Sequence, residues 1–150
     1  MKNLWTMLVL VGLLALVAGI PAAAQTTTGP NIEVKFTAPM AFYVGDKLMP
    51  AGAYEITQSA GVQANTLLVK GKGKNEAYIG YSVQKVEEPL AKMEVNFNKY
   101  GNNEYLNAIK WPGELNTGAS WLIVIAPSAG EQAAAKTAAA AAHAIPASKK

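Results

Sequence analysis

Between Ile32 and Ile125, apolar and polar side chains alternate in short runs, and Gly, Pro, Asn or Asp residues separate these runs. Alternation with a period of two is typical of a strand that buries one face, because successive side chains of a strand point to opposite sides. The same region lacks the 3.6-residue period of an amphipathic helix. The pattern therefore predicts an all-β fold, an antiparallel β-sandwich or barrel of about seven to eight short strands.

The runs and the turns between them place the individual strands. Tyr100–Asn103 has the composition of a hairpin turn. Trp121–Ile125 is apolar at every position, which predicts a central strand covered on both faces, with Trp121 in the core. The expected strands cover residues 32–38, 40–44, 54–57, 66–70, 77–83, 93–97, 105–111 and 121–125.

The first 24 residues have the layout of a secretory signal. Lys2 precedes an uncharged apolar run from Leu4 to Ile20, and Ala22 and Ala24 satisfy the small-x-small rule for cleavage. The sequence predicts cleavage after Ala24 and export to the periplasm or the medium. It predicts no transmembrane segment after cleavage and a flexible start over residues 25–31.

The composition changes after Pro127. Ser128 and Glu131 have the spacing of a capping box, and alanines dominate the following residues up to Ala144. Because this segment has no large apolar side chain before Ile145, a helix here would have no apolar face to pack against a core. We expect a β-domain over residues 32–127, followed over residues 128–150 by an Ala-rich tail, helical or disordered, that ends its helix before Pro146.

Two segments resemble a known group of proteins. Residues 36–45 and 48–56, which contain Phe42-Tyr43-Val44-Gly45 and Pro50-Ala51-Gly52-Ala53-Tyr54-Glu55-Ile56, are similar to small exported β-domain proteins of soil bacteria, notably acidobacteria. These proteins share a pattern of the type F-x-V-G…L-P-A-G-x-Y-x-I. Here Met49 separates Leu48 from Pro50, a small departure. The resemblance implies export and a β-fold, and no activity.

The composition limits the chemistry that this chain can perform. It has no Cys, and its one His, His143, falls in the expected tail, where we expect it to be solvated. Hydrolytic and transfer reactions usually need a positioned base, a nucleophile or a metal. The sequence therefore predicts a protein that is not an enzyme, with no catalytic residue, metal or cofactor. All its cationic side chains are Lys, so we expect no nucleic-acid partner.

Two groups of residues are candidates for binding. Lys70, Lys72 and Lys74 lie on one expected turn, where they could meet anionic envelope polymers or lipid head groups, or could serve solubility alone. Aromatic rings near strand ends could stack on sugars, or could fill the core of a domain without disulfides. Trp111 precedes Pro112-Gly113 and could be exposed; the other candidate rings are Tyr100 and Tyr105.

Three functions fit these features. The first is an exported, non-catalytic β-domain of the envelope or secreted fraction, with a binding or structural role and with an envelope glycan or another exported protein as its partner. The second is a carbohydrate-binding module that uses Trp111 and the tyrosines. The third is a subunit of a surface assembly, in which strand 32–38 or the Ala-rich tail docks onto a neighbour.

Overall fold

A computed structural model describes residues 30–59, 65–113 and 119–150. The expected signal peptide, residues 1–24, and most of the expected flexible start lie outside the described residues. Within them, no helix is both long and apolar enough to cross a membrane. The elements are β1 Glu33–Ala38, β2 Phe42–Val44, β3 Lys47–Met49, β4 Gly52–Gln58, β5 Thr66–Lys70, β6 Glu76–Val86, β7 Glu94–Tyr100, β8 Asn103–Trp111, β9 Ser120–Ile125, α2 Ala129–Thr137 and β10 Ala141–Lys149.

Eight of the strands form a closed antiparallel barrel, which confirms the predicted all-β class. The strands follow one another as β8, β7, β10, β1, β4, β5, β6 and β9, and pairing of β9 with β8 closes the ring. The short β2–β3 hairpin attaches to β8 through a parallel bridge between Tyr43 and Tyr105. Closure gives each barrel strand a neighbour on both sides, so β1 has no unpaired edge.

Two long strands form corners of the barrel because each changes its neighbour partway along. In β6, Gly80 is the last residue opposite β5 and Tyr81 is the first opposite β9. In β10, Pro146 is the last residue opposite β7 and Ala147 is the first opposite β1. Proline has no N–H to donate and is suited to such a break in a ladder. β6 and β10 therefore join two differently oriented sheets into one barrel.

The interior of the barrel is filled by the side chains that the alternation predicts to be buried. β2 places Phe42 inside, where its ring centroid lies 5.9 Å from Phe36, 5.0 Å from Tyr54 and 5.3 Å from Phe97. Each large apolar side chain buried in this way contributes about 1.5–3 kcal/mol. In a chain without disulfides, this aromatic cluster and the aliphatic residues around it supply the main stabilisation.

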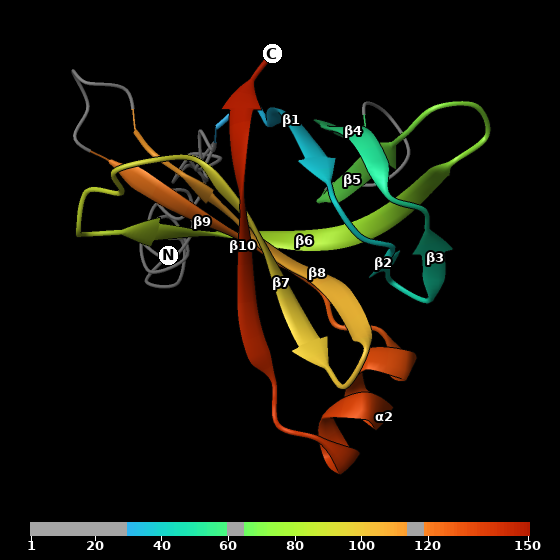
Figure 1. Cartoon of the computed structure of the whole chain (residues 1–150). Helices are drawn as coiled ribbons and strands as arrows, with labels where there is room; N and C mark the ends of the chain where they lie inside the picture. Colours follow the sequence, from blue (N-terminus) through green and yellow to red (C-terminus); the bar gives the residue numbers. More distant parts are fainter. Residues whose placement is uncertain (1–29, 60–64, 114–118) are drawn as a thin grey trace, which may run out of the picture.

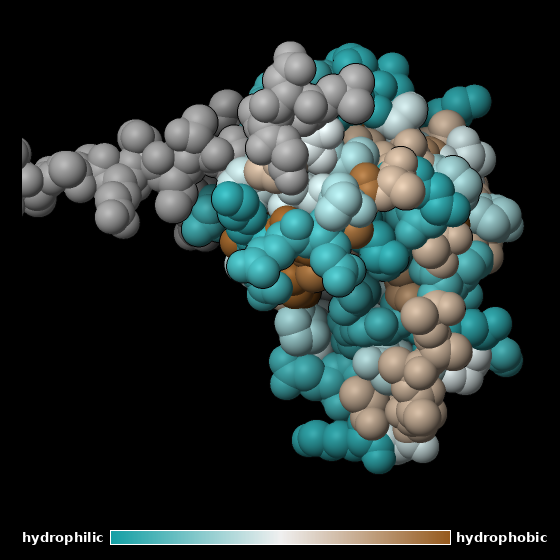
Figure 2. Space-filling model, turned by 90° about the vertical axis from the view of Figure 1, so that its left-hand side faces the viewer, coloured by the Kyte–Doolittle hydropathy of each residue, from teal (hydrophilic) through white to brown (hydrophobic). Residues whose placement is uncertain are grey.

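The first part of the expected tail forms the helix that its sequence predicts. Ser128 is the N-cap of α2, and its Oγ accepts a hydrogen bond from the backbone N–H of Glu131, 3.1 Å away. Glu131 does not complete the capping box, because its carboxylate accepts a hydrogen bond from Asn98 on β7. The lower part of the surface in Figure 2, at the height of α2 in Figure 1, shows weakly hydrophobic residues beside hydrophilic ones.

The prediction for the rest of the tail is wrong. Residues 141–149 form β10, which fills the gap between β1 and β7 and runs from the end near α2 to the C-terminus (Figure 1). The barrel therefore extends beyond residue 127, and Ile145 is part of the core. Alanine has the highest helix propensity, but propensity is a small energy per residue, and the backbone pairing offered by two strand edges outweighs it. Pro146 also disfavours continuation of a helix.

Trp111 and Trp121 differ from the expectation as well. They face each other across the β8–β9 pair, so they lie on the same side of the sheet. Trp111, expected to be exposed, is only 6% exposed, whereas Trp121 is half-buried. β9 is central as predicted, between β6 and β8, but its second face is only partly covered. An uninterrupted apolar run therefore does not ensure that both faces of a strand are fully covered.

Substitutions in β10 test whether this strand belongs to the core. Ile145→Ala should lower the free energy of unfolding by about 2–5 kcal/mol, the usual range for a buried isoleucine. Ala144→Ser, the adjacent outward-facing position, should change it by less than about 0.5 kcal/mol. Urea unfolding followed by circular dichroism measures both values. Equal stability of the two variants would show that β10 does not pack against the barrel.

Candidate functional site

A groove of about 1070 Å³ crosses the outer face of β10, β1, β4 and β5 and reaches the turn after β5. The side chains that line it come mainly from the outward positions of these strands, which alternate with the core positions. Thr37, Thr57 and Ser148 contribute hydroxyl groups, while Leu68 and Pro146 contribute apolar surface. The groove therefore combines hydrogen-bonding groups with a partly apolar floor.

Lysines give this groove its charge. Four lysines line it, Lys35, Lys70, Lys72 and Lys150, against one carboxylate, that of Glu55. Lys35 and Lys70 lie on either side of Glu55 in one row across β1, β4 and β5, so their Cα atoms are about 10 Å apart. The lining therefore has an excess of three positive charges.

Lys150 forms ion pairs with two acidic side chains at this surface. Its ammonium lies 2.9 Å from Glu55 Oε1 and 3.2 Å from Glu33 Oε1. The hydrogen bond from Lys150 is the main reason why the pKa of Glu55 lies below its usual value, and the charges of Lys35 and Lys70 lower it further. The pKa of Lys150 is raised by its bonds to Glu55 and Glu33.

The remaining lysines of the groove form no ion pair of this kind with the described residues. In the described part of the chain, no ion pair engages Lys35, Lys70 or Lys72. Two of the three lysines singled out from the sequence, Lys70 and Lys72, thus line the groove. The third, Lys74, is exposed in the same turn but lies outside the lining. The sequence did not indicate that Lys35 and Lys150 belong to this surface. Their position depends on pairing between distant strands, which the local pattern does not reveal.

The aromatic candidates do not form one platform. Tyr100 and Tyr105 are close, with ring centroids 6.0 Å apart, and Tyr105 is stacked on Tyr43 at 4.9 Å. Trp111 lies at the other end of β8, about 20 Å from Tyr105 along the strand. The ammonium of Lys149 lies 4.9 Å from the centroid of the Trp111 ring. Trp111 is therefore buried and covered, and offers no open face to a sugar.

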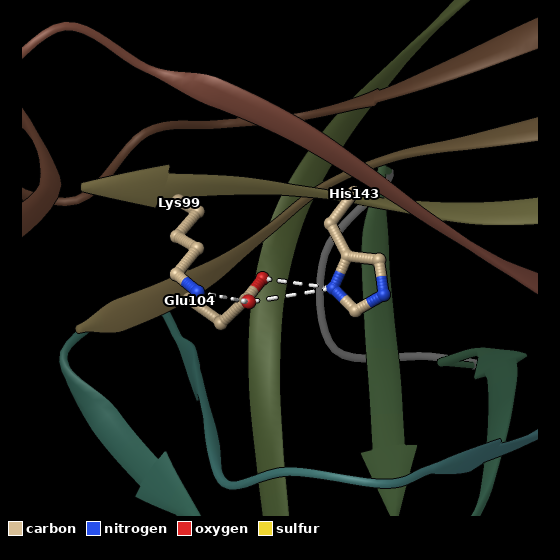
Figure 3. Close-up of polar contacts among 3 residues, drawn as sticks. All are labelled: Lys99, Glu104 and His143. Carbon is tan, nitrogen blue, oxygen red and sulfur yellow. Dashed lines mark hydrogen bonds and ion pairs between the residues drawn. The ribbon is translucent and has the colours of Figure 1, made fainter. Parts of the chain in front are cut away.

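The structure corrects the placement of His143, which is not on a solvated tail. His143 lies on β10 opposite Phe97, and its Nδ1 is 3.3 Å from both carboxylate oxygens of Glu104 on β8 (Figure 3). Lys99 Nζ lies 3.9 Å from Glu104 Oε1. The three residues come from three adjacent strands and share the inward side of the sheet. Because the sequence predicted a helical or disordered tail for this segment, it did not indicate a contact between His143 and Glu104.

The environment of Glu104 suggests a structural role for this cluster. Glu104 is 5% exposed, and a buried carboxylate is costly unless charged or hydrogen-bonding groups compensate it. Lys99 and His143 supply that compensation. Glu104 and His143 do not line the groove described above. Among the described residues, no group of three or more His, Asp or Glu side chains is placed to hold a metal.

Comparisons with protein-family models, with curated proteins and with solved structures gave no match. The resemblance to exported β-domain proteins of soil bacteria thus stays a prediction from the sequence.

Proposed function

We propose that the chain is exported and that its barrel is a non-catalytic binding domain for an acidic polymer of the cell envelope or its surroundings. The observation that carries this proposal is the groove across β10, β1, β4 and β5, in which no ion pair among the described residues engages Lys35, Lys70 or Lys72. Unpaired cations on one face attract anionic ligands and raise their local concentration. The row of lysines would suit an extended ligand with repeated negative charges.

The type of cation and its surroundings support a polymer over a single phosphate group. Lysine acts as a flexible point charge, whereas fixed two-point recognition of one phosphate or carboxylate usually uses arginine, which this chain lacks. The hydroxyls of Thr37, Thr57 and Ser148 could bind sugar hydroxyls between the charged groups. The apolar floor at Leu68 and Pro146 would contact the rings of a polysaccharide.

The groups in the groove favour binding over catalysis. Glu55 is the carboxylate of the lining, and its lowered pKa makes it a weaker base than an ordinary glutamate. An acid–base reaction would need a second group with a pKa near the working pH. His143 does not line the groove, and its Nδ1 contacts Glu104. The absence of catalysis therefore remains part of the proposal.

Export rests on residues 1–24 and can be tested separately. Expression of the full chain in a diderm bacterial host should yield an envelope or medium fraction whose protein begins at Gln25, because Ala22 and Ala24 form the cleavage site. Intact-mass and N-terminal peptide analysis by mass spectrometry measures this. Protein that keeps Met1 or Lys2 in that fraction, or that stays in the cytoplasm, would contradict export with cleavage.

Binding can be tested with the chain from Gln25 onward and polygalacturonate as the acidic probe. Replacing Lys35, Lys70 and Lys72 together by Gln should weaken binding at least tenfold, about 1.4 kcal/mol, in isothermal titration calorimetry. Binding should also weaken as salt is added, because ions screen exposed charges.

The matched control replaces three exposed lysines outside the groove, Lys74, Lys85 and Lys136, by Gln, which changes the net charge by the same amount. This control should retain most of the affinity. Equal losses in the two triple variants, or no measurable binding of polygalacturonate by the unaltered chain, would contradict the proposed site.

A further inference from the structure

A second and separate cavity lies between α2 and the outer face of β7, β8 and β9. Its volume is about 410 Å³, within the usual range for sites of small ligands. Polar side chains surround it: Asn98 and Tyr100 from β7, Asn107 from β8, and Glu131 and Gln132 from α2. Lysine, which dominates the groove described above, is missing from this lining.

The way α2 is attached explains why a space remains beneath it. The backbone N–H of Gly130 donates to Asp46 Oδ1 at 3.0 Å, and Asn98 Nδ2 donates to Glu131 Oε1 at 3.0 Å. These polar contacts hold the start of the helix against the barrel. The next turn presents Ala135 to the cavity, and an alanine side chain is too short to fill the gap to the sheet.

A bulge in the sheet contributes one of the lining groups. In the β7–β8 pair, Asn96 lies opposite Ala108 but Phe97 lies opposite Leu106, so Asn107 is the extra residue. Bulges break the ladder locally and change the direction of a side chain. Asn107 lines the cavity at this irregular position.

We propose that this cavity binds a neutral sugar residue. Asn98, Asn107 and Gln132 each carry an amide with both donor and acceptor groups, as hydroxyl groups require. Asn98 uses one N–H for Glu131 and Gln132 uses one for the carbonyl of Pro127, but each amide has a second N–H and a carbonyl oxygen. The Glu131 carboxylate adds acceptors and disfavours anionic ligands, and the Tyr100 ring offers a face to the C–H groups of a pyranose. The site uses the tyrosine expected from the sequence, without Trp111, and does not depend on the groove.

The test is a titration of the ¹⁵N-labelled chain from Gln25 onward with cello-, manno-, xylo- and chitotetraose, followed by NMR. At least one tetrasaccharide should cause saturable shifts of the amide signals of Asn98, Tyr100, Asn107 and Gln132. Gln132→Ala, which removes an exposed side chain, and Asn107→Ala should each weaken binding about tenfold, with unchanged spectra elsewhere. The triple groove variant at Lys35, Lys70 and Lys72 should bind the sugar like the unaltered chain.

Asn102→Ala, in the exposed turn between β7 and β8, is the matched control and should leave the affinity unchanged. The proposal is overturned if none of the four sugars causes saturable shifts. It is also overturned if the shifts fall on the groove residues, or if Gln132→Ala binds as tightly as Asn102→Ala does. Because Gln132 is exposed, its variant decides the matter even if Asn107→Ala disturbs the fold.

Discussion

The backbone pairing of β10 with β1 and β7 is the interaction on which the remaining structure depends. Without β10, these two strands would each present a row of unpaired N–H and C=O groups, which favours aggregation. β10 also supplies Ile145 to the core and Pro146 and Ser148 to the groove, and it positions Lys150, the next residue, in the groove lining. One strand of mostly small residues thus joins β1 to β7 within the barrel and completes the surface that we propose as the binding site.

Buried charges specify how the last part of the chain docks. Glu104 is compensated by His143 from β10 and by Lys99, and Glu131 by Asn98. An unpaired buried carboxylate is costly. Displacement of β10 or α2 would remove the partner of a buried carboxylate and would therefore raise the free energy of the fold. This supports a defined position for a segment whose alanines make few specific packing contacts.

The features that follow from local sequence could be predicted. The alternation in residues 32–38 and 77–83 gives β1 and part of β6, and Tyr100–Asn103 gives the β7–β8 hairpin, with Gly101 at φ 61°. Features that depend on pairing between distant segments could not. The edges that accept β10 lie far from it in the sequence, so the alanines indicated a helix. For the same reason, Lys35 and Lys150 could not be assigned to the face of Lys70, or His143 to Glu104.

The central claim, that residues 141–149 are a barrel strand, is tested most directly by NMR of the backbone in solution. The account predicts slow amide hydrogen exchange in β10, comparable with that of its neighbours. It also predicts interstrand nuclear Overhauser effects from His143 to Phe97 and from Ala147 to Phe36. Amides of residues 141–149 that exchange at the rates of an unfolded peptide, or that show the short-range pattern of a helix, would contradict it.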